Sequence, residues 1–470
     1  MSVQCSKKTS FEDCELAILR SAVDKIENNK GKIKLQNESI KNIIRIVEDF
    51  IKGNNCICYG GTAINNILPE HDQFYNKDVE FPDYDFYSPT ALEHAKQLAD
   101  IYYKSGYEEV EAKSGMHTGT YKVFVNFIPV ADITQMDSNI FKSIKKSSLR
   151  INEILYCPPN FLRMSMYLEL SRPKGDVSRW EKVLKRITLL NKHYPLKESN
   201  CSNHEVQRIF SDENYKSKDI FTLLKDIFIR EKVVFFGAMA NRLYSRYMPG
   251  HIQKNIKKIP DFDVLSENPE HTAQIVKAKL GESGIKKISI RKHKNVGELI
   301  STHYEIIVGE ETVAFVYEPL SCHSFNIIRM SKYKVRIATI DTMLSFYLAF
   351  LYSNRPYFNI DRILCMCQYL FIVQEKNRLN QRGLLKRFTM SCIGTQASME
   401  DIRAQKSELF NKLKVNRNSK EFERSFLKYL PNKQTAQNIK KKTKKRVVKS
   451  SKKKTRKNPS IFSSLLFWLS

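Results

Sequence analysis

The sequence contains ten cysteines but no C-x-x-C pair, the spacing that most cysteine zinc sites and dithiol sites use. Its two C-x-C pairs, Cys56/Cys58 and Cys365/Cys367, have no His or Cys partner at zinc-site spacing. The first pair fits alternate positions of a strand, and the second lies in an apolar helical pattern. We therefore expect no cysteine-based metal site, and we expect free thiols in a reducing compartment.

Long apolar runs are missing as well. The N-terminal residues contain no apolar signal region, and the closing stretch Ile461–Leu469 is too short to span a bilayer. We therefore expect neither a membrane protein nor a membrane partner.

Acidic residues are few beside basic ones, since 50 Asp and Glu stand against 78 Lys and Arg and leave a net charge of +28. Twelve of the eighteen residues from Lys440 to Lys457 are basic and none is acidic. Such a block is usually solvated and disordered, and it acts either as a localisation tail or as an arm that grips RNA. The rest of the chain still carries +16. This charge favours a polyanion as partner, with nucleic acid first and an anionic membrane surface second.

A succession of helix, strand, glycine turn and helix occurs twice. In the first copy, an apolar helical face at 40–51 ends near Gly53, and a strand at 56–59 leads to a helix at 63–68. In the second copy, the helix lies at 220–228, the strand at 233–236 and the next helix at 239–244. Further matches follow in the same order: Phe81–Asp85 with Ile259–Asp263, and Ser171–Pro173 with Asn354–Pro356. Several matches in one order indicate an internal duplication.

The expected fold class is therefore mixed α/β (α+β) with two tandem units. An N-terminal helical segment (1–34), opened by Ser10 with Asp13 as its capping pair, precedes the first unit at 35–198. The polar segment 192–218 links it to the second unit at 215–380. A C-terminal helical segment (381–430), with one or two charged helices at 398–430, and a basic disordered tail (431–470) follow.

Gly60, Gly61 and Thr62 lie between the first strand and the following helix. Glycines at such a turn let backbone N–H groups approach a phosphate, and the helix N-terminus favours negative charge. The Thr62 hydroxyl adds a donor. Many strand-to-helix turns use glycine for geometry alone, so this motif needs support from other residues.

Asp83 and Asp85 supply that support. Residues two apart in an extended strand point to the same side, so both carboxylates would face one site. Close like charges repel unless cations neutralise them, and divalent ions with oxygen ligands do this. Two such ions promote phosphoryl transfer. The bland alternative is an exposed D-x-D on a loop.

Asp132 is the candidate third carboxylate. It lies at the end of the best strand candidate of the first unit, Thr120–Ile133. There it would bind one metal ion and help to deprotonate an attacking hydroxyl. Asp137 is the second choice, and a strand-end turn residue is the structural alternative.

A Gly-Gly-Thr turn, an Asp-x-Asp pair and a distant strand Asp resemble the polymerase-β-type nucleotidyltransferase superfamily. The spacing departs from that pattern through an insertion, Pro69–Val79, which we expect to be a surface loop. The runs Tyr156–Pro159, Phe161–Pro173 and Gly175–Val183 resemble the poly(A) polymerase catalytic subunits of large DNA viruses of the mimivirus and African swine fever virus kind.

The resemblance implies template-free tailing of mRNA 3′ ends with ATP and Mg²⁺ or Mn²⁺. It also implies a viral protein of the virion and the host cytoplasm, including the viral factory. Nothing in the residues themselves indicates a preference for ATP. Processive tailing needs extended RNA contact, which a homodimer could provide.

The second unit is expected to be a degenerate nucleotidyltransferase-like copy that packs on the first and guides RNA. It keeps Asp261 and Asp263 but has Gly237-Ala238-Met239 at the phosphate turn. Aligning Val313–Phe315 with Val125–Phe127 places Leu320 where the first unit has Asp132, with Glu318 as the nearest acid.

Arg179, Lys182 and Arg186 recur at helical spacing and would form a cationic face for the triphosphate. A solvated basic face is the alternative. Arg172, which has a counterpart at Arg355, is expected to be structural. Two rival functions remain open: another nucleotidyltransferase (CCA-adding, uridylyl or small-molecule-modifying), and a non-catalytic RNA-binding or processivity subunit.

Overall fold

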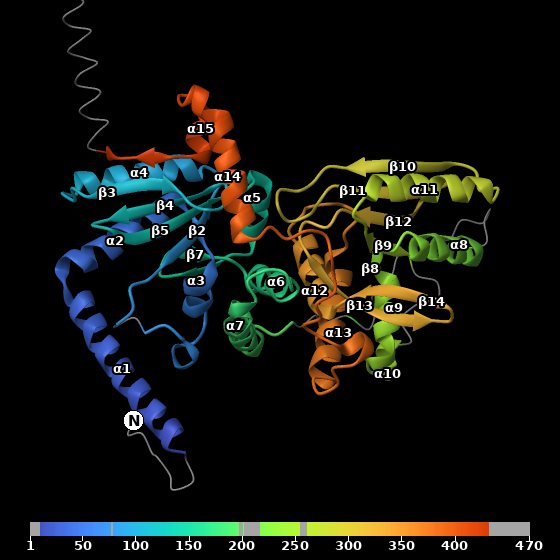
Figure 1. The fold of residues 1–470 in the computed structure, drawn as a ribbon, viewed down its shortest axis with the longest axis horizontal. Coiled ribbons are helices and arrows are strands. Elements are labelled where there is room, and N and C mark those ends of the chain that lie inside the picture. Colours follow the sequence, from blue (N-terminus) through green and yellow to red (C-terminus); the bar gives the residue numbers. More distant parts are fainter. Residues whose placement is uncertain (1–9, 77–78, 197–200, 202–216, 254–260, 432–470) are drawn as a thin grey trace, which may run out of the picture.

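The protein, as a computed structural model, is described here for residues 10–76, 79–196, 201, 217–253 and 261–431. Two mixed α/β units lie side by side, and α1 (Phe11–Gln36) points away from the first of them (Figure 1). Helix α1 begins as expected, because the Ser10 hydroxyl oxygen accepts a hydrogen bond from the Asp13 N–H at 3.1 Å. Among the described residues, no helix combines the length and apolar character that crossing a bilayer requires.

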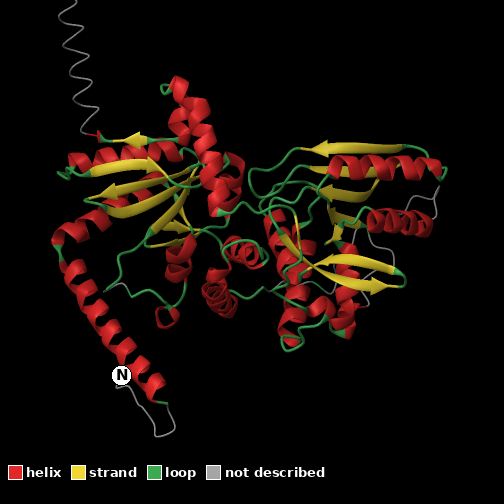
Figure 2. Cartoon of the chain, in the orientation of Figure 1, coloured by secondary structure: helices red, strands yellow, loops and turns green. Residues whose placement is uncertain are grey.

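The first unit is built on an eight-stranded mixed sheet in the order β16-β3-β4-β5-β2-β1-β7-β6 (Figure 2). Burial alternates along its strands, as in β4, so one face packs on helices while the other carries polar groups. The strands are β1 (Ile57–Cys58), β2 (Tyr84–Ser88), β3 (Val110–Ser114), β4 (Thr120–Val125), β5 (Ile128–Gln135), β6 (Leu149–Ile151), β7 (Ile154–Tyr156) and β16 (Lys428–Tyr429).

Six helices belong to this unit: α2 (Glu38–Asn54), α3 (Gly60–Ile67), α4 (Ala91–Lys104), α5 (Ser138–Lys146), α6 (Pro159–Leu170) and α7 (Trp180–His193). The apolar face expected at 40–51 is the buried face of α2. The expected stop at Gly53 is wrong, because α2 continues to Asn54. Asn55 ends it in the left-handed region (φ 50°), where its N–H bonds the carbonyls of Ile51 and Lys52.

The sheet of the second unit, in the order β10-β11-β12-β9-β8-β14-β13-β15, repeats seven strands of the first sheet, from β3 to β6. The eighth strands lie at opposite edges, since β16 pairs with β3 and β15 with β13, the counterpart of β6. Each pairing direction is the same in both sheets; for example, β2–β5 and β9–β12 are parallel. The two copies expected from the sequence are thus visible as topology. The strands are β8 (Val234–Phe235), β9 (Phe262–Leu265), β10 (Ile288–His293), β11 (His303–Val308), β12 (Glu311–Tyr317), β13 (His323–Met330), β14 (Tyr333–Ala338) and β15 (Cys392–Ile393).

Helices α6 and α7 of the first unit face α12 and α13 of the second (Figure 1). Phe161 on α6 and Tyr352 after α12 meet edge to face with ring centroids 5.2 Å apart, and the Ser324 N–H bonds the Ser171 carbonyl at 2.9 Å. The two units therefore share a packed boundary. The helices of the second unit are α8 (Ser217–Arg230), α9 (Ala238–Tyr244), α10 (Gly250–Gln253), α11 (Pro269–Glu282), α12 (Ile340–Phe350) and α13 (Ile360–Lys376).

The segment Thr120–Ile133, expected as one strand, is an antiparallel hairpin. Strands β4 and β5 flank Asn126 and Phe127, which have positive φ angles of 49° and 65°. Consecutive residues in this region make the tight turn whose twist matches two paired strands. The sequence hides the turn because Phe127 is a poor turn former, and its ring is 83% exposed here.

The C-terminal segment returns to the first unit. Helices α14 (Met399–Leu413) and α15 (Lys420–Ser425) are the charged helices expected there, and β16 then pairs with β3. The Tyr429 hydroxyl donates to Asp100 on α4 at 2.7 Å. Residues far apart in sequence thus complete one sheet. The predicted linker begins within α7, and most of it, like the basic tail from 432 on, lies outside the described residues.

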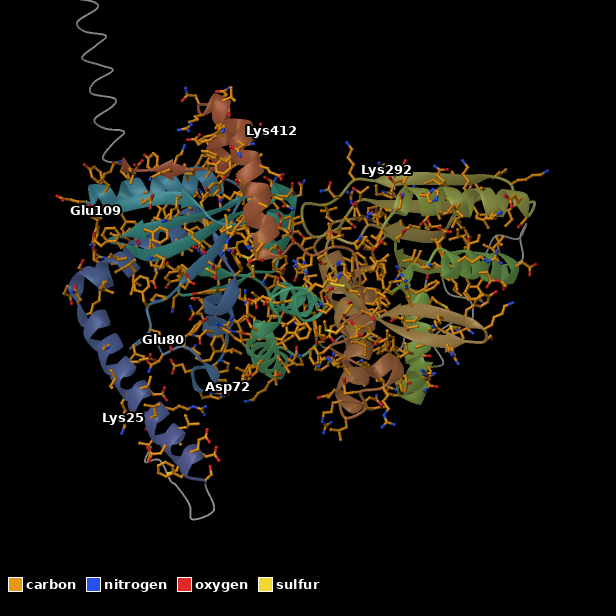
Figure 3. All side chains as sticks on the ribbon, viewed as in Figure 1. Lys25, Asp72, Glu80, Glu109, Lys292 and Lys412 are labelled. Carbon is orange, nitrogen blue, oxygen red and sulfur yellow. A yellow bond between two sulfur atoms is a disulfide. The ribbon has the colours of Figure 1, made fainter. Side chains whose placement is uncertain are left out.

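The expectation of free thiols is wrong for several cysteines. Cys201 is bonded to Cys365, and Cys322 is bonded to Cys392, with Cα–Cα distances of 5.4 and 5.3 Å (Figure 3). Cys56, Cys58, Cys157 and Cys367 are free and buried. The sequence could not show these contacts, because the bonded residues lie 164 and 70 positions apart.

Replacing Tyr429 should destabilise the first unit. Tyr429→Ala removes a side chain that is 8% exposed, together with its hydrogen bond to Asp100, so we expect a loss of about 3 kcal/mol. Thermal unfolding against Val415→Ala, a control at a residue 90% exposed, measures it. Equal melting temperatures for the two variants would show that β16 does not support the sheet.

Candidate active site

The fold brings the three predicted carboxylates together. Strands β2 and β5 are parallel neighbours in which Asp85 pairs with Asp132, and Asp83 comes directly before β2. Asp83 and Asp85 lie two apart, so both side chains lie on the sheet face that Asp132 occupies. Asp83 is exposed and Asp85 is half-buried, while the Asp132 side chain is 18% exposed.

Mutual repulsion is visible in the titration of these groups. Burial, followed by the negative charges of Asp83 and Asp132, raises the pKa of Asp85 to about 7. Although Asp83 is exposed as a residue, partial desolvation of its carboxyl group and the charge of Asp132 raise its pKa above the ordinary value. The site therefore holds an excess of negative charge, and carboxylate oxygens are the ligands that Mg²⁺ and Mn²⁺ prefer. The donor set fits the predicted divalent ions.

Lys122 offsets part of this charge. It stands on β4 opposite Asp132, and its ammonium is paired with that carboxylate. The same cation lowers the pKa of Asp83 and of Asp85. Sequence reasoning missed Lys122 because the hairpin that aligns it with Asp132 was not predicted.

Gly60 allows the turn Gly60–Thr62, called the phosphate turn here, to lie directly against Asp85. A Cβ at Gly60 would stand 2.4 Å from Asp85 Oδ2, and its φ is +73°, so a side chain is excluded twice. Thr62 is buried and donates its hydroxyl proton to the Asp83 carbonyl at 2.6 Å. Thr62 therefore ties the turn to β2, and its role as a phosphate donor stays a prediction.

Gly61 lies beneath two side chains from distant segments. A Cβ there would stand 2.5 Å from the Tyr75 hydroxyl and 2.9 Å from Arg186 Nη2, which donates to that hydroxyl at 2.6 Å. The Arg186 guanidinium also lies over the Phe74 ring, 4.9 Å from its centroid. Tyr75 is a residue that sequence reasoning missed, because it lies in the insertion Pro69–Val79.

The described part of that insertion is anchored. Asn65 on α3 accepts hydrogen bonds from the backbone N–H groups of Phe74 and Tyr75, both at 2.8 Å. The expectation of a plain surface loop is therefore wrong for the segment that carries Tyr75. Its backbone is tied to the helix that begins at the phosphate turn.

The predicted basic face lies beside the carboxylates. Lys182, exposed on α7, lowers the pKa of Asp83. Arg179, just before α7, lowers the pKa of Asp85 and forms an ion pair with Glu169 at 3.0 Å. Lys182 and Arg186 thus present charge toward the site, whereas Arg179 is shared with a carboxylate. The second-choice acid, Asp137, accepts from the N–H groups of Asn139 and Ile140 and is the N-cap of α5.

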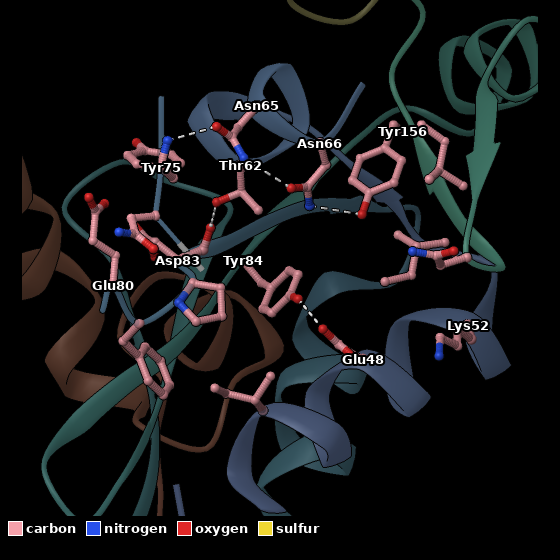
Figure 4. A pocket seen from close by; sticks show the side chains of 17 residues that line it. Glu48, Lys52, Thr62, Asn65, Asn66, Tyr75, Glu80, Asp83, Tyr84 and Tyr156 are labelled. Carbon is pink, nitrogen blue, oxygen red and sulfur yellow. Dashed lines mark hydrogen bonds between the residues drawn. The ribbon is translucent and has the colours of Figure 1, made fainter. Parts of the chain in front are cut away.

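A cavity of about 420 Å³ borders the site from the other side of Asp83 (Figure 4). Thr62, Asp83 and Tyr75 line it together with Glu48 and Tyr156, but Asp85 and Asp132 do not. Asp85, Asp132, Gly60 and Gly61 therefore lie outside this cavity, whereas Asp83 and Thr62 border it.

The second unit keeps the backbone arrangement of this site but lacks its third carboxylate. Gly237 again lies on an aspartate, since a Cβ there would stand 2.2 Å from Asp263 Oδ2. The residue that pairs with Asp263 is Phe315, as Asp132 pairs with Asp85. The expectation that Leu320 takes this position is wrong, because Asn126 and Phe127 form a turn after β4, whereas Phe315 lies within β12.

Aromatic rings occupy the region around Phe315. Its ring stacks on Tyr357 with centroids 5.1 Å apart, and Glu305 stands opposite it, where the first unit has Lys122. Asp261, Asp263 and Arg362 line a cavity of only about 50 Å³. Two carboxylates remain, with an apolar ring at the third position.

Asp85→Asn should stabilise the metal-free protein at high pH. The folded chain holds the Asp85 proton up to pH of about 7 and the unfolded chain only to about 3.8, so ionisation weakens the fold as pH rises between them. We expect a gain of roughly 1–4 kcal/mol at pH 8 and a smaller one at pH 5. Thermal melts in chelator measure it, with exposed Asp49→Asn as control. A gain that is equal at both pH values would contradict the assigned pKa.

Residues 45–176 match the family model of the poly(A) polymerase catalytic subunit, a stretch that contains the glycine turn and all three carboxylates. A protein of Acanthamoeba polyphaga mimivirus is 31% identical over 209 residues, which cover 44% of this chain and 35% of that protein. A protein of African swine fever virus (isolate Pig/Kenya/KEN-50/1950) is 33% identical over 163 residues, 33% of this chain and 34% of that protein. Both carry the provisional name of poly(A) polymerase catalytic subunit.

The alignments thus span about a third of each of these relatives. The crystal structure of the Megavirus polyadenylate synthase has a TM-score of 0.75 to this chain at 22% identity, covering 95% of this chain and 92% of that one. It shows that the whole two-unit fold is shared. The chain is therefore similar to the poly(A) polymerase catalytic subunits of large DNA viruses, and residues 45–176 match the model of that family.

Proposed function

We propose that the first unit adds adenylates from ATP to RNA 3′ ends without a template and releases pyrophosphate. The observation that carries this proposal is the grouping of Asp83, Asp85 and Asp132 beside a glycine turn at the N-terminus of α3. The family match over residues 45–176 covers the same group. The net charge of +28 suits an RNA substrate.

Asp83 and Asp85 would hold both metal ions, and Asp132 the ion on the side of the RNA end. When bound, the ions neutralise phosphate charge and make the RNA 3′-hydroxyl a better nucleophile. Lys122 neutralises Asp132 in the metal-free chain. The 3′-hydroxyl gives up its proton with the help of Asp132, and its oxygen forms a bond to the α-phosphorus of ATP. The bond from that phosphorus to the β-phosphate oxygen breaks, and pyrophosphate leaves with the electron pair.

The β- and γ-phosphates would lie at Gly60, Gly61 and the first turn of α3, where backbone N–H groups favour anions. Arg186 and the Tyr75 hydroxyl lie over Gly61 and supply donors from the opposite side. Lys182 adds charge near Asp83, and Arg179 near Asp85. The expected donor role of Thr62 requires its hydroxyl to leave the Asp83 carbonyl.

The second unit acts as a scaffold that packs on the first and guides RNA. Phe315 in place of the third carboxylate supports the absence of catalysis there. The adenylate preference rests on the family resemblance, as do the expected homodimer and the expected sites in the virion, host cytoplasm and viral factory.

A gel assay separates this proposal from its rivals. Purified protein, a short labelled RNA and Mg²⁺ are incubated with each NTP in turn, and we expect extension with ATP. A CCA-adding or uridylyl enzyme would extend the RNA with CTP or UTP instead. Absence of extension with every NTP would leave the non-catalytic RNA-binding subunit as the better description.

The two units should respond differently to the same substitution. Asp83→Asn removes a ligand worth several kcal/mol of charge stabilisation, so extension should fall by at least about 100-fold. Asp261→Asn, the matched change in the second unit, should leave it within about twofold. Equal losses would contradict the inactive second unit.

Tyr75→Phe should weaken ATP binding without harming the fold. Loss of one hydrogen bond to a charged phosphate weakens binding by about 1.5 kcal/mol, so the KM for ATP should rise about tenfold. Tyr103→Phe on α4, at a ring 36% exposed, is the control. An unchanged KM for ATP would place the triphosphate elsewhere.

A further inference from the structure

Three side chains that commonly bind metals meet on the far side of the insertion from the carboxylates. His71 and Asp72 belong to the short helical turn η1 (Glu70–Asp72), and His193 is the last residue of α7. Their ligand atoms all lie within 4.8 Å of one another. Asp72 is labelled in Figure 3, below the green helix α7. The reaction proposed above does not use this cluster.

The spacing suits a tetrahedral ion. Asp72 Oδ2 lies 2.5 Å from His193 Nε2 and 3.7 Å from His71 Nε2. Ligands about 2.0–2.2 Å from a zinc ion stand roughly 3.4 Å apart at tetrahedral angles. To reach this spacing, the distance from Asp72 to His193 must lengthen and the distance from Asp72 to His71 must shorten slightly. Rotations of these side chains achieve both changes without moving the backbone.

The donor set selects the class of metal. Two imidazoles and one carboxylate suit Zn²⁺ and related transition ions, whereas Mg²⁺ prefers oxygen alone. The side chains of Asp72 and His193 are each 18% exposed, and that of His71 is 72% exposed. The cluster is thus sheltered on one side and open on the other, which leaves an entry path and room for a water as fourth ligand.

Lys192 competes for the same carboxylate. Its ammonium lies 2.5 Å from Asp72 Oδ2, and its side chain is 58% exposed. An arriving ion must displace the lysine, and a long exposed side chain can swing into solvent.

We propose that His71, Asp72 and His193 form a zinc site that clips the insertion to the end of α7. The ion would join two segments about 120 residues apart. Each of these segments also places a side chain over the phosphate turn. Tyr75 lies four residues after His71, and Arg186 lies two helical turns before His193 on α7. Bound zinc would hold Tyr75 and Arg186 over Gly61. The benefit of this placement for phosphate binding rests on the proposed function, whereas the zinc site itself does not.

Binding is tested on the full chain in the Asp83→Asn background, which weakens the competing carboxylate site. The protein is stripped with chelator and titrated with Zn²⁺ by calorimetry, and Co²⁺ absorption then reports tetrahedral coordination. We expect one ion per chain, lost in His193→Asn and in Asp72→Asn. His117→Asn, at an exposed histidine of the same unit, should bind normally.

Lys192→Met distinguishes a metal site from an ion-pair network. Removing the competing cation should tighten zinc binding, by about tenfold or more, a gain that misfolding cannot produce. A simple network predicts only a lower melting temperature and no gain. The proposal is overturned if zinc uptake is unchanged in His193→Asn and Asp72→Asn, or if Lys192→Met binds no tighter. Because Asp83→Asn is inactive by design, these results do not depend on polymerase activity.

Discussion

The repulsion among three carboxylates on one sheet face is the constraint around which the first unit is arranged. Parallel pairing of β2 with β5 brings Asp85 against Asp132. Burial and the charges of Asp83 and Asp132 together raise the pKa of Asp85 to about 7. Lys122 offsets part of the charge from the neighbouring strand. Because Gly60 has no side chain, the N-terminus of α3 can approach the Asp85 carboxylate. Stability is thus reduced at the place where the proposed function puts the metal ions and the phosphates.

The second unit shows that the frame alone does not make such a place. It has the same order of seven strands, the same glycine against an aspartate and the same Asp-x-Asp pair. Phe315 replaces the third carboxylate, and stacked rings fill the space around it. The fold of this copy therefore persists without the third carboxylate, which agrees with function belonging to the site and not to the fold.

Local patterns in the sequence were enough to find the duplication, the carboxylate pair and Asp132. They failed where distant segments decide the outcome. The turn at Asn126 and Phe127 is concealed by an exposed aromatic ring, and missing it hid Lys122 and misplaced Leu320. Tyr75 reaches Gly61 only because Asn65 holds its backbone. The disulfides and the pairing of β16 with β3 likewise join residues whose sequence gives no sign of contact.

The return of β16 to β3 also sets an order for synthesis. The ribosome synthesises β3 long before it reaches Tyr429, and the whole second unit is made in between. During that time the edge of the first sheet has open backbone N–H and C=O groups, the kind of edge on which chains aggregate. The nascent first unit is therefore an unfinished domain, and the last described strand of the chain is the one that seals it.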